Sequence, residues 1–205
     1  MTNRHLDLLS QRAPVLSECL NDIQSGFEIL RTAFASRQKL LICGNGGSAS
    51  DAEHWAGELL KGFRSKRPLF PEEQTQLPPE IAGKLQGALP VIPLTGFPSF
   101  ATAFANDVDP DLIFSQLVWA LGNPGDVLIC MSTSGNARNV CSAAQVARAR
   151  GLTTIALTGQ SGGSLSPLCD LSIRVPATET YLIQELHLPV YHCLCLMLED
   201  EFFAG

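Results

Sequence analysis

One pattern occurs twice in this chain: an apolar run that ends in a turn rich in glycine, serine or threonine and then leads into helical spacing. The first copy is 39–43 followed by Gly44-Asn-Gly-Gly-Ser48, and the second is 126–131 followed by Ser132-Thr-Ser-Gly-Asn136. Glycine lets the backbone approach a phosphate, and the first N–H groups of a helix have no partner within the helix. The two copies therefore predict a site for a small phosphorylated molecule at neighbouring strand ends.

Five short apolar runs alternate with stretches of helical spacing along the chain. Strands are predicted at 39–43, 91–94, 127–131, 153–157 and 171–175. Helices are predicted at 5–36 with a break near Pro14, at 48–63, 100–105, 111–121, 137–150 and 179–203, with a turn at Asn106-Asp107. Apolar strands that alternate with helices are typical of a parallel sheet covered on both faces. The expected fold is α/β: a flavodoxin-like, three-layer, five-stranded parallel sheet flanked by helices.

The chain of 205 residues is expected to form a single domain, 1–205, with one interruption. Residues 65–90 are rich in proline, and only a short helix around 80–85 is expected there. Structureless segments of this length are uncommon unless they are functional. This segment, called the excursion below, is therefore expected on the surface, where a lid, a partner-binding loop and a loop without function all remain open.

The composition excludes several classes of protein. The net charge is −6 and no basic block is present, which argues against nucleic acid as a partner. No apolar run approaches the ~20 residues that span a bilayer, and residues 1–7 lack the apolar core of a signal peptide. A cytoplasmic protein without membrane contact is expected. The seven cysteines, none in C-x-x-C spacing, are expected to be buried reduced thiols.

Two groups of polar side chains have spacings that suit chemistry. His54 and Glu58 lie four residues apart on a predicted helix and so face the same way, as an acid–base pair or two metal ligands would. On the last predicted helix, Gln184 and His192 share a stripe, although about 12 Å of helical rise separates them. His187 lies off that stripe and is expected to be structural or exposed. Taken alone, the polar residues of the last helix are more typical of a polar stripe at a subunit interface than of a ligand site.

Together these segments resemble the sugar-isomerase (SIS) superfamily and, within it, the phosphoheptose isomerases. The resemblance rests on the order of the two turns, the His54 and Glu58 pair, 157–159, and 183–187 followed by His192. It covers nearly the whole chain except most of the excursion. It implies an aldose–ketose isomerase that converts sedoheptulose 7-phosphate to D-glycero-D-manno-heptose 7-phosphate through an enediol. It also implies a homotetramer with sites between subunits, which the long first helix and the apolar last helix would suit.

The resemblance also implies a role for each matching residue. Glu58 is expected as the base that takes a carbon-bound proton, and His192 as the acid that serves the carbonyl oxygen. A Zn²⁺ or similar ion is expected at His54, Glu58, Gln184 and His192. The residues expected to bind the substrate and its phosphate are Asn45, Gly46, Gly47, Ser48, Asn106, Asp107, Ser132, Thr133, Ser134 and Gln184.

Two departures from the family pattern concern the choice of sugar. Ala137 stands where the family often has a phosphate-contacting serine, and Tyr181-Leu182 stands where members have Asp-Arg. Another phosphosugar, including a capsule-pathway or nucleotide-linked heptose precursor, therefore remains open as the substrate.

The alternative classes are a hexulose- or pentose-phosphate isomerase on the same fold, and a non-catalytic member that binds a phosphosugar or a replication initiator. The presence of both Glu58 and His192 favours the heptose enzyme. A Rossmann dehydrogenase is disfavoured, because Ala49 replaces the third glycine and no acidic residue ends a second strand at the expected distance.

Overall fold

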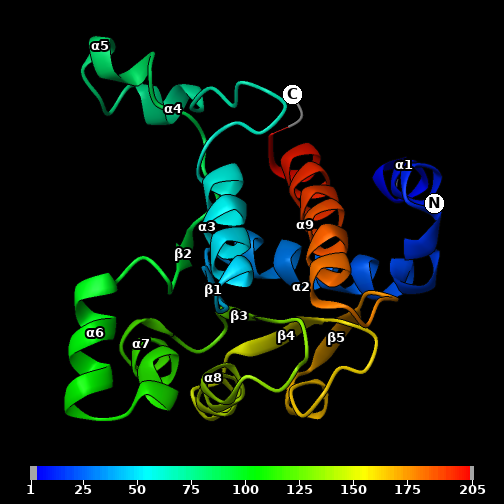
Figure 1. Ribbon diagram of the computed structural model, residues 1–205. Helices are drawn as coiled ribbons and strands as arrows, with labels where there is room; N and C mark the ends of the chain where they lie inside the picture. The colour runs from blue at the N-terminus through cyan, green and yellow to red at the C-terminus, as the bar shows by residue number, and fades with distance from the viewer. Residues whose placement is uncertain (1–3, 204–205) are drawn as a thin grey trace.

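The computed structural model describes residues 4–203, and its centre is a five-stranded parallel sheet (Figure 1). The strands are β1 (Leu40–Cys43), β2 (Val91–Pro93), β3 (Val127–Ser132), β4 (Thr153–Thr158) and β5 (Leu171–Arg174). Their order is β2-β1-β3-β4-β5, and Cys43 of β1 stands opposite Cys130 of β3. All five predicted strands and the α/β class are confirmed. Because β1 and β3 are neighbours, the two turns that follow them lie side by side.

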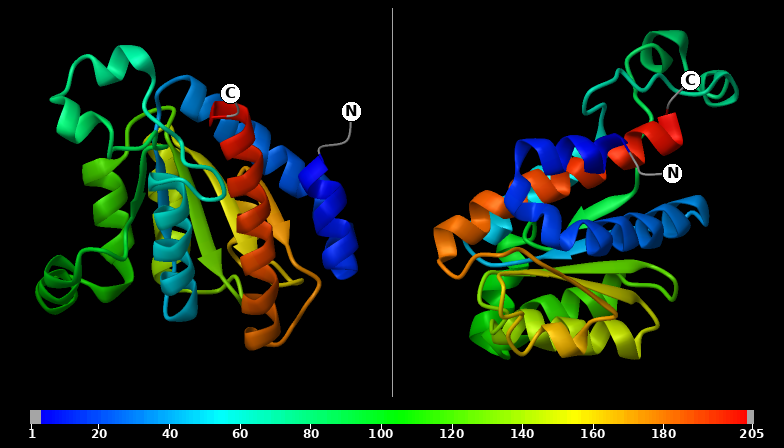
Figure 2. Two further views of the ribbon diagram at one scale, coloured as in Figure 1. Left: turned by 90° about the horizontal axis from the view of Figure 1, so that it is seen from above. Right: turned by 90° about the vertical axis from the view of Figure 1, so that its right-hand side faces the viewer.

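Helices cover both faces of the sheet, which gives three layers (Figures 1 and 2). One face carries α1 (Arg4–Arg12), α2 (Leu20–Ala35), α3 (Gly47–Leu60) and α9 (Thr180–Phe203). The other side carries α6 (Pro98–Asp107), α7 (Ile113–Leu121) and α8 (Arg138–Ala149). Leu40 and Ile42 point into the first core, and Leu41 and Cys43 point into the second. Since successive strand residues face opposite sides, burial on both faces explains why the strands are apolar throughout.

The first predicted helix is interrupted where the proline stands. α1 ends at Arg12, and a 3₁₀ helix, η1 (Pro14–Cys19), precedes α2. Proline has no N–H and cannot continue the helical bonding, so the break near Pro14 is confirmed. Two further 3₁₀ turns, η2 (Pro110–Leu112) and η3 (Ser166–Leu168), connect elements elsewhere.

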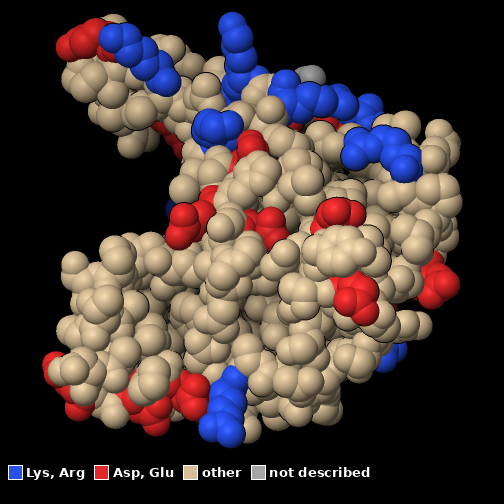
Figure 3. Space-filling model, viewed as in Figure 1, with Lys and Arg blue, Asp and Glu red and all other residues tan. Residues whose placement is uncertain are grey.

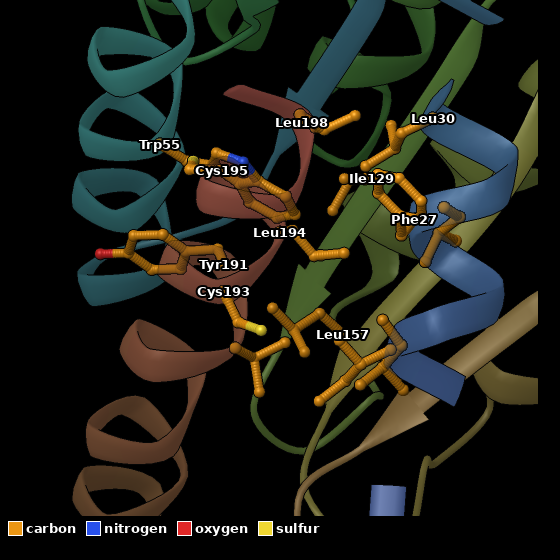
Figure 4. Close-up of a cluster of buried hydrophobic side chains, with 14 of the residues drawn as sticks. Phe27, Leu30, Trp55, Ile129, Leu157, Tyr191, Cys193, Leu194, Cys195 and Leu198 are labelled. Carbon is orange, nitrogen blue, oxygen red and sulfur yellow. The ribbon is translucent and has the colours of Figure 1, made fainter. Parts of the chain in front are cut away.

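The last helix is buried by its own chain. Tyr191, Leu194 and Leu198 of α9 are buried in a cluster with residues of α2, α3 and the sheet, of which Phe27 and Ile129 are examples (Figure 4). The apolar character of α9, which from the sequence was expected to suit a tetramer, does not itself require a partner subunit, because α1, α2, α3 and the sheet cover most of that surface. No helix among residues 4–203 is long and apolar enough to cross a membrane.

The excursion stands apart from the body of the molecule (Figure 1). It contains α4 (Pro71–Gln74), which was not predicted, and α5 (Pro79–Ala82), at the start of the helix expected around 80–85. An antiparallel bridge between Pro68 and Gln86 closes its base, and the N–H of Gly87 donates to the Arg67 carbonyl at 2.7 Å. The excursion is thus a closed hairpin-like projection at the end of α3.

All seven cysteines are free thiols. Five are buried, while Cys141 and Cys169 are half-buried. The prediction of free thiols in place of a disulfide framework is confirmed. The prediction that all of them are buried holds for five and is wrong for Cys141 and Cys169.

Candidate active site

The two turns form one cavity at the carboxyl edge of the sheet. Its volume is about 310 Å³, and its lining residues are Asn45, Gly46, Gly47, Ser48, Met131, Ser132, Thr133, Ser134, Ala137, Thr180 and Gln184. All the residues predicted to bind substrate lie here except Asn106 and Asp107. The site predicted from the repeated pattern is therefore a single space between β1, β3 and the start of α9.

The cavity is suited to an anion although no Lys or Arg lines it. Three helices begin at its wall: α3 at Gly47, α8 after Ala137, and α9 at Thr180. The N-terminal end of a helix carries a partial positive charge and unpaired N–H groups. Lys and Arg gather mainly along the upper edge of the face shown in Figure 3, over the excursion and the end of α9. A phosphate in the cavity would thus be held by helix ends and hydroxyls.

The second turn is held in place by Asn136. Its backbone N–H donates to Ser134 Oγ at 3.1 Å, and its Oδ1 accepts from the N–H and the hydroxyl of Ser164, both at 3.0 Å. Gly135 has φ +68°, and a Cβ there would clash with the backbone of Gly162. Glycine is required for that close approach.

Sequence reasoning missed one residue that lines this cavity, Thr180, and one that supports its wall from outside, Asn139. Asn139 of α8 and Asn45 exchange amide hydrogen bonds, both 2.9 Å long, and so link the first turn to the helix after the second. Thr180 contributes a hydroxyl from the first residue of α9. Nothing in their spacing distinguishes either residue from an ordinary helix-surface residue.

A second cluster of polar side chains lies further along α3 and α9. His54 Nε2 is 3.2 Å from Glu58 Oε1, and the His54 and His192 rings meet edge to face with their centroids 5.2 Å apart. The two helices lie side by side and run in the same direction (Figures 1 and 2). Gln184 packs against Gly47, so the cluster begins two helical turns, or about 10 Å, beyond the cavity.

A buried tyrosine contacts the ring nitrogen of His54 that does not face Glu58. The Tyr191 hydroxyl lies 2.9 Å from His54 Nδ1 and 3.2 Å from Asp51 Oδ1, while its ring stacks on Trp55. Figure 4 shows the hydroxyl pointing away from the apolar cluster. Burial raises the pKa of Asp51, and the Tyr191 hydrogen bond and the charge of His54 partly offset this. Neither Asp51 nor Tyr191 was predicted, although each lies close in sequence to a predicted site residue.

His192 has a nitrogen available for a ligand. Its Nε2 is buried and has no hydrogen-bond partner within the described residues. Burial lowers the pKa of His192, and the charge of His54 lowers it further, against an opposite effect of Glu58. The imidazole is therefore neutral near pH 7 and can donate one hydrogen bond and accept another.

The predicted metal ligands are only partly brought together. His54, Glu58 and His192 lie close to one another, but Gln184 lies against Gly47, about 10 Å away along the helix. Among residues 4–203, no three His, Cys, Asp or Glu side chains converge as the ligands of a metal ion would. The donor types suit Zn²⁺, yet a single chain does not assemble the full set.

Asn106 and Asp107 lie outside the cavity. They are the last two residues of α6 and not a separate turn, so the turn predicted there was wrong: the helix continues through them. Both side chains are exposed, and Asn106 Nδ2 donates to Asp107 Oδ1 at 2.9 Å.

The excursion does not cover the cavity of its own chain. Gly47, at the cavity, is the first residue of α3, and the excursion follows the other end of this 14-residue helix, about 20 Å away. Of the roles left open for the excursion, a lid over this cavity therefore does not fit within one chain.

Comparison with known proteins agrees with the geometry. Residues 101–197 match the family model described as SIS domain. A phosphoheptose isomerase of Halorhodospira halophila is 38% identical over 202 residues, which cover 97% of this chain and 92% of that protein. One of Chromohalobacter salexigens is 40% identical over 186 residues, covering 89% and 85%.

Solved structures give the same result. The phosphoheptose isomerase of Neisseria gonorrhoeae superposes with a TM-score of 0.74 at 33% identity and covers 94% of this chain and 93% of that one. That of Francisella tularensis gives 0.78 at 31% identity, covering 92% and 91%. The resemblance to this family is confirmed over nearly the full length of the chain, and the chain belongs to the phosphoheptose isomerase family of SIS-domain proteins.

Proposed function

We propose that this chain is an aldose–ketose isomerase that interconverts sedoheptulose 7-phosphate and D-glycero-D-manno-heptose 7-phosphate. The relatives' names support the reaction. The observation that carries the proposal is the spacing of the two clusters: the anion cavity and the Glu58–His192 pair lie about 10 Å apart along the same two helices. A heptose with its phosphate in the cavity has six carbon–carbon bonds of about 1.5 Å each before C1, so its reacting carbons reach that pair.

The residues then divide the proton transfers. The Glu58 carboxylate takes a proton from C1 while His192 donates one to the C2 carbonyl oxygen, which yields the 1,2-enediol. Glu58 returns its proton to C2 as the O1 hydroxyl gives its proton to His192, and the aldose forms with both residues restored. Tyr191 holds the His54 ring beside Glu58, and Thr133 and Ser134 bind the phosphate at the other end.

The metal and the oligomer are part of the proposal. A Zn²⁺ ion that took His54, Glu58, Gln184 and His192 as ligands would need them from more than one subunit, since one chain does not bring them together, and it would polarise the carbonyl when bound. Elemental analysis of the active enzyme tests the metal proposal, since activity without any bound metal would contradict it.

A homotetramer with sites between subunits is proposed from the family resemblance, and light scattering should give about four times the 22.0 kDa of the chain. The cytoplasmic location stays a prediction.

A substrate series tests the proposed function. Purified protein is assayed with sedoheptulose 7-phosphate, with unphosphorylated sedoheptulose and with five- and six-carbon ketose phosphates. Turnover should be lost without the phosphate and should fall at least ~10-fold in kcat/KM for the shorter sugars, because their C1 and C2 cannot reach Glu58 while the phosphate stays bound. Equal or higher kcat/KM for a shorter sugar would overturn the assignment of a heptose as the substrate. Binding of every sugar without turnover would overturn the proposal that the chain is an isomerase.

A further inference from the structure

A buried ion pair joins the end of α3 to α9. Arg67 and Glu199 are only 1% and 3% exposed, and Arg67 Nε donates to Glu199 Oε1 at 2.7 Å. Removing two charges from water is costly, so such a pair is weak support for stability alone. The groups that hydrogen-bond to Glu199 and Arg67 therefore indicate a further role for the pair.

Glu199 holds the segment that follows α3. Its carboxylate accepts from the backbone N–H groups of Phe63, Arg64 and Ser65 at 2.8, 3.0 and 3.1 Å, in addition to Arg67. Burial raises the pKa of Glu199, but these hydrogen bonds outweigh that effect and leave the pKa below its ordinary value. The carboxylate is therefore ionised and fixes the chain after α3 onto α9.

Arg67 holds the last turn of α3. Its two terminal nitrogens donate to the carbonyls of Leu59 at 3.0 Å and Glu58 at 3.3 Å. The last carbonyls of a helix lack intrahelical partners, and α3 ends in the extended residue Lys61 and not in a glycine cap. The guanidinium also lies 4.7 Å from the centre of the Phe203 ring, near the end of α9. One side chain thus contacts the backbone of the proposed base and the helix of the proposed acid.

We infer that Arg67, through Glu199, is a positioning residue that sets Glu58 against His192. Glu199 lies seven residues, or two turns, after His192 on the same face of α9. The pair therefore fixes how far α3 can slide or rotate along α9. An error of about 1 Å in the placement of reacting groups can cost about 100-fold in rate. The kinetic part of this inference rests on the proposed function, whereas the geometric part does not.

The kinetic test compares the buried Arg67–Glu199 pair with a second ion pair that is only partly buried. Arg67→Met removes the cation, and Arg67→Lys keeps the charge but loses the fork of donors. The matched control is Lys39→Met, which breaks the Lys39–Asp126 pair (Nζ–Oδ2 2.5 Å) just before β1. At a temperature at which circular dichroism shows all variants folded, the Arg67 variants should lose at least ~10-fold in kcat with KM nearly unchanged, and Lys39→Met should keep its kcat. Wild-type kcat in a folded Arg67→Lys, or an equal loss in Lys39→Met, would overturn the inference.

A second readout does not depend on turnover. The chain has four histidines, so the ring signals of His54 and His192 can be followed by NMR after ¹³C labelling of histidine. Arg67→Lys should shift both signals and weaken the contact between the two rings, while Lys39→Met should leave them in place. Unchanged rings in Arg67→Lys would contradict the positioning role. Shifted rings in a protein whose wild type turns over no sugar would support the positioning role and overturn the proposed function alone.

Discussion

The Tyr191 hydroxyl binds two polar partners at once. A hydroxyl has one proton and two lone pairs, so it can bridge His54 and Asp51 and keep His54 Nε2 facing Glu58. Tyr191→Phe should keep the stacking on Trp55 but lower kcat roughly fivefold, as the loss of about 1 kcal/mol of hydrogen bonding would. Ser25→Ala, which removes an exposed hydroxyl on α2 away from the site, is the control. Steady-state kinetics that did not separate the two variants would contradict this role.

Gly47 leaves room for the amide of Gln184 at the cavity wall. A Cβ at Gly47 would occupy the place of the Gln184 side chain, whose flexible end can move away. Gly47→Ala should therefore raise KM severalfold with little loss of thermal stability. Gly57→Ala is the control on the same helix, because a Cβ there meets nothing within 4 Å, and it should stabilise the protein by up to about 1 kcal/mol. An unchanged KM in Gly47→Ala would argue that Gln184 does not contact the sugar.

His187 should make the protein sensitive to acid. Its side chain is fully buried, so of the two expected roles, structural or exposed, it has the structural one. Burial lowers its pKa to about 4 from an ordinary 6.5. Between these values the unfolded chain binds a proton that the native chain does not, so stability is complete above pH 6.5 and falls as the pH falls towards 4. The loss is about 3 kcal/mol. Urea unfolding at pH 7 and pH 4.5 should show a smaller loss for His187→Leu than for the wild type, and identical losses would contradict the assignment.

At the scale of elements, the strands and the cavity turns could be predicted because their signals are local. Each strand is an apolar run, and each turn follows it directly, so neighbouring residues carry the pattern. The Arg67–Glu199 pair and the contact of Gln184 with Gly47 join residues more than a hundred positions apart. No periodicity encodes such contacts, because they depend on how α3 packs against α9. For the same reason the sequence did not show that α9 is covered by its own chain.

The outer part of the excursion, residues 70–85, should be dispensable for folding. Within 70–85 only Ala82 is buried, and the bridge between Pro68 and Gln86 already brings the two ends together. Replacing 70–85 by a short Gly/Ser linker should leave the circular dichroism spectrum unchanged and the melting temperature within a few degrees, since little apolar area is lost. The replacement leaves Arg67 in place, because its side chain bonds to Glu199 and to the end of α3. A collapse of the melting temperature would show that the excursion packs against a surface that this chain alone does not present.

At the scale of the whole molecule, one sheet edge and one pair of helices hold both halves of the proposed site. In the proposed site the phosphate binds at the edge between β1 and β3, and α3 and α9 carry Glu58 and His192 two turns further along. Large apolar side chains that remain exposed, among them Val108 and Trp119, agree with the proposed assembly of subunits. The separation of the two halves is the feature that we propose selects a long phosphosugar over a short one.

Solvent-isotope exchange tests directly whether Glu58 moves the carbon-bound proton of the sugar. Wild type and Glu58→Gln are incubated with sedoheptulose 7-phosphate in deuterated water, and the sugar is followed by NMR. The wild type should form the aldose with deuterium at C2, while folded Glu58→Gln should lose at least ~100-fold in both exchange and product formation, because its amide cannot accept the carbon-bound proton. Exchange at the wild-type rate in Glu58→Gln, or product from the wild type without any deuterium from solvent, would contradict proton transfer by Glu58 through an enediol.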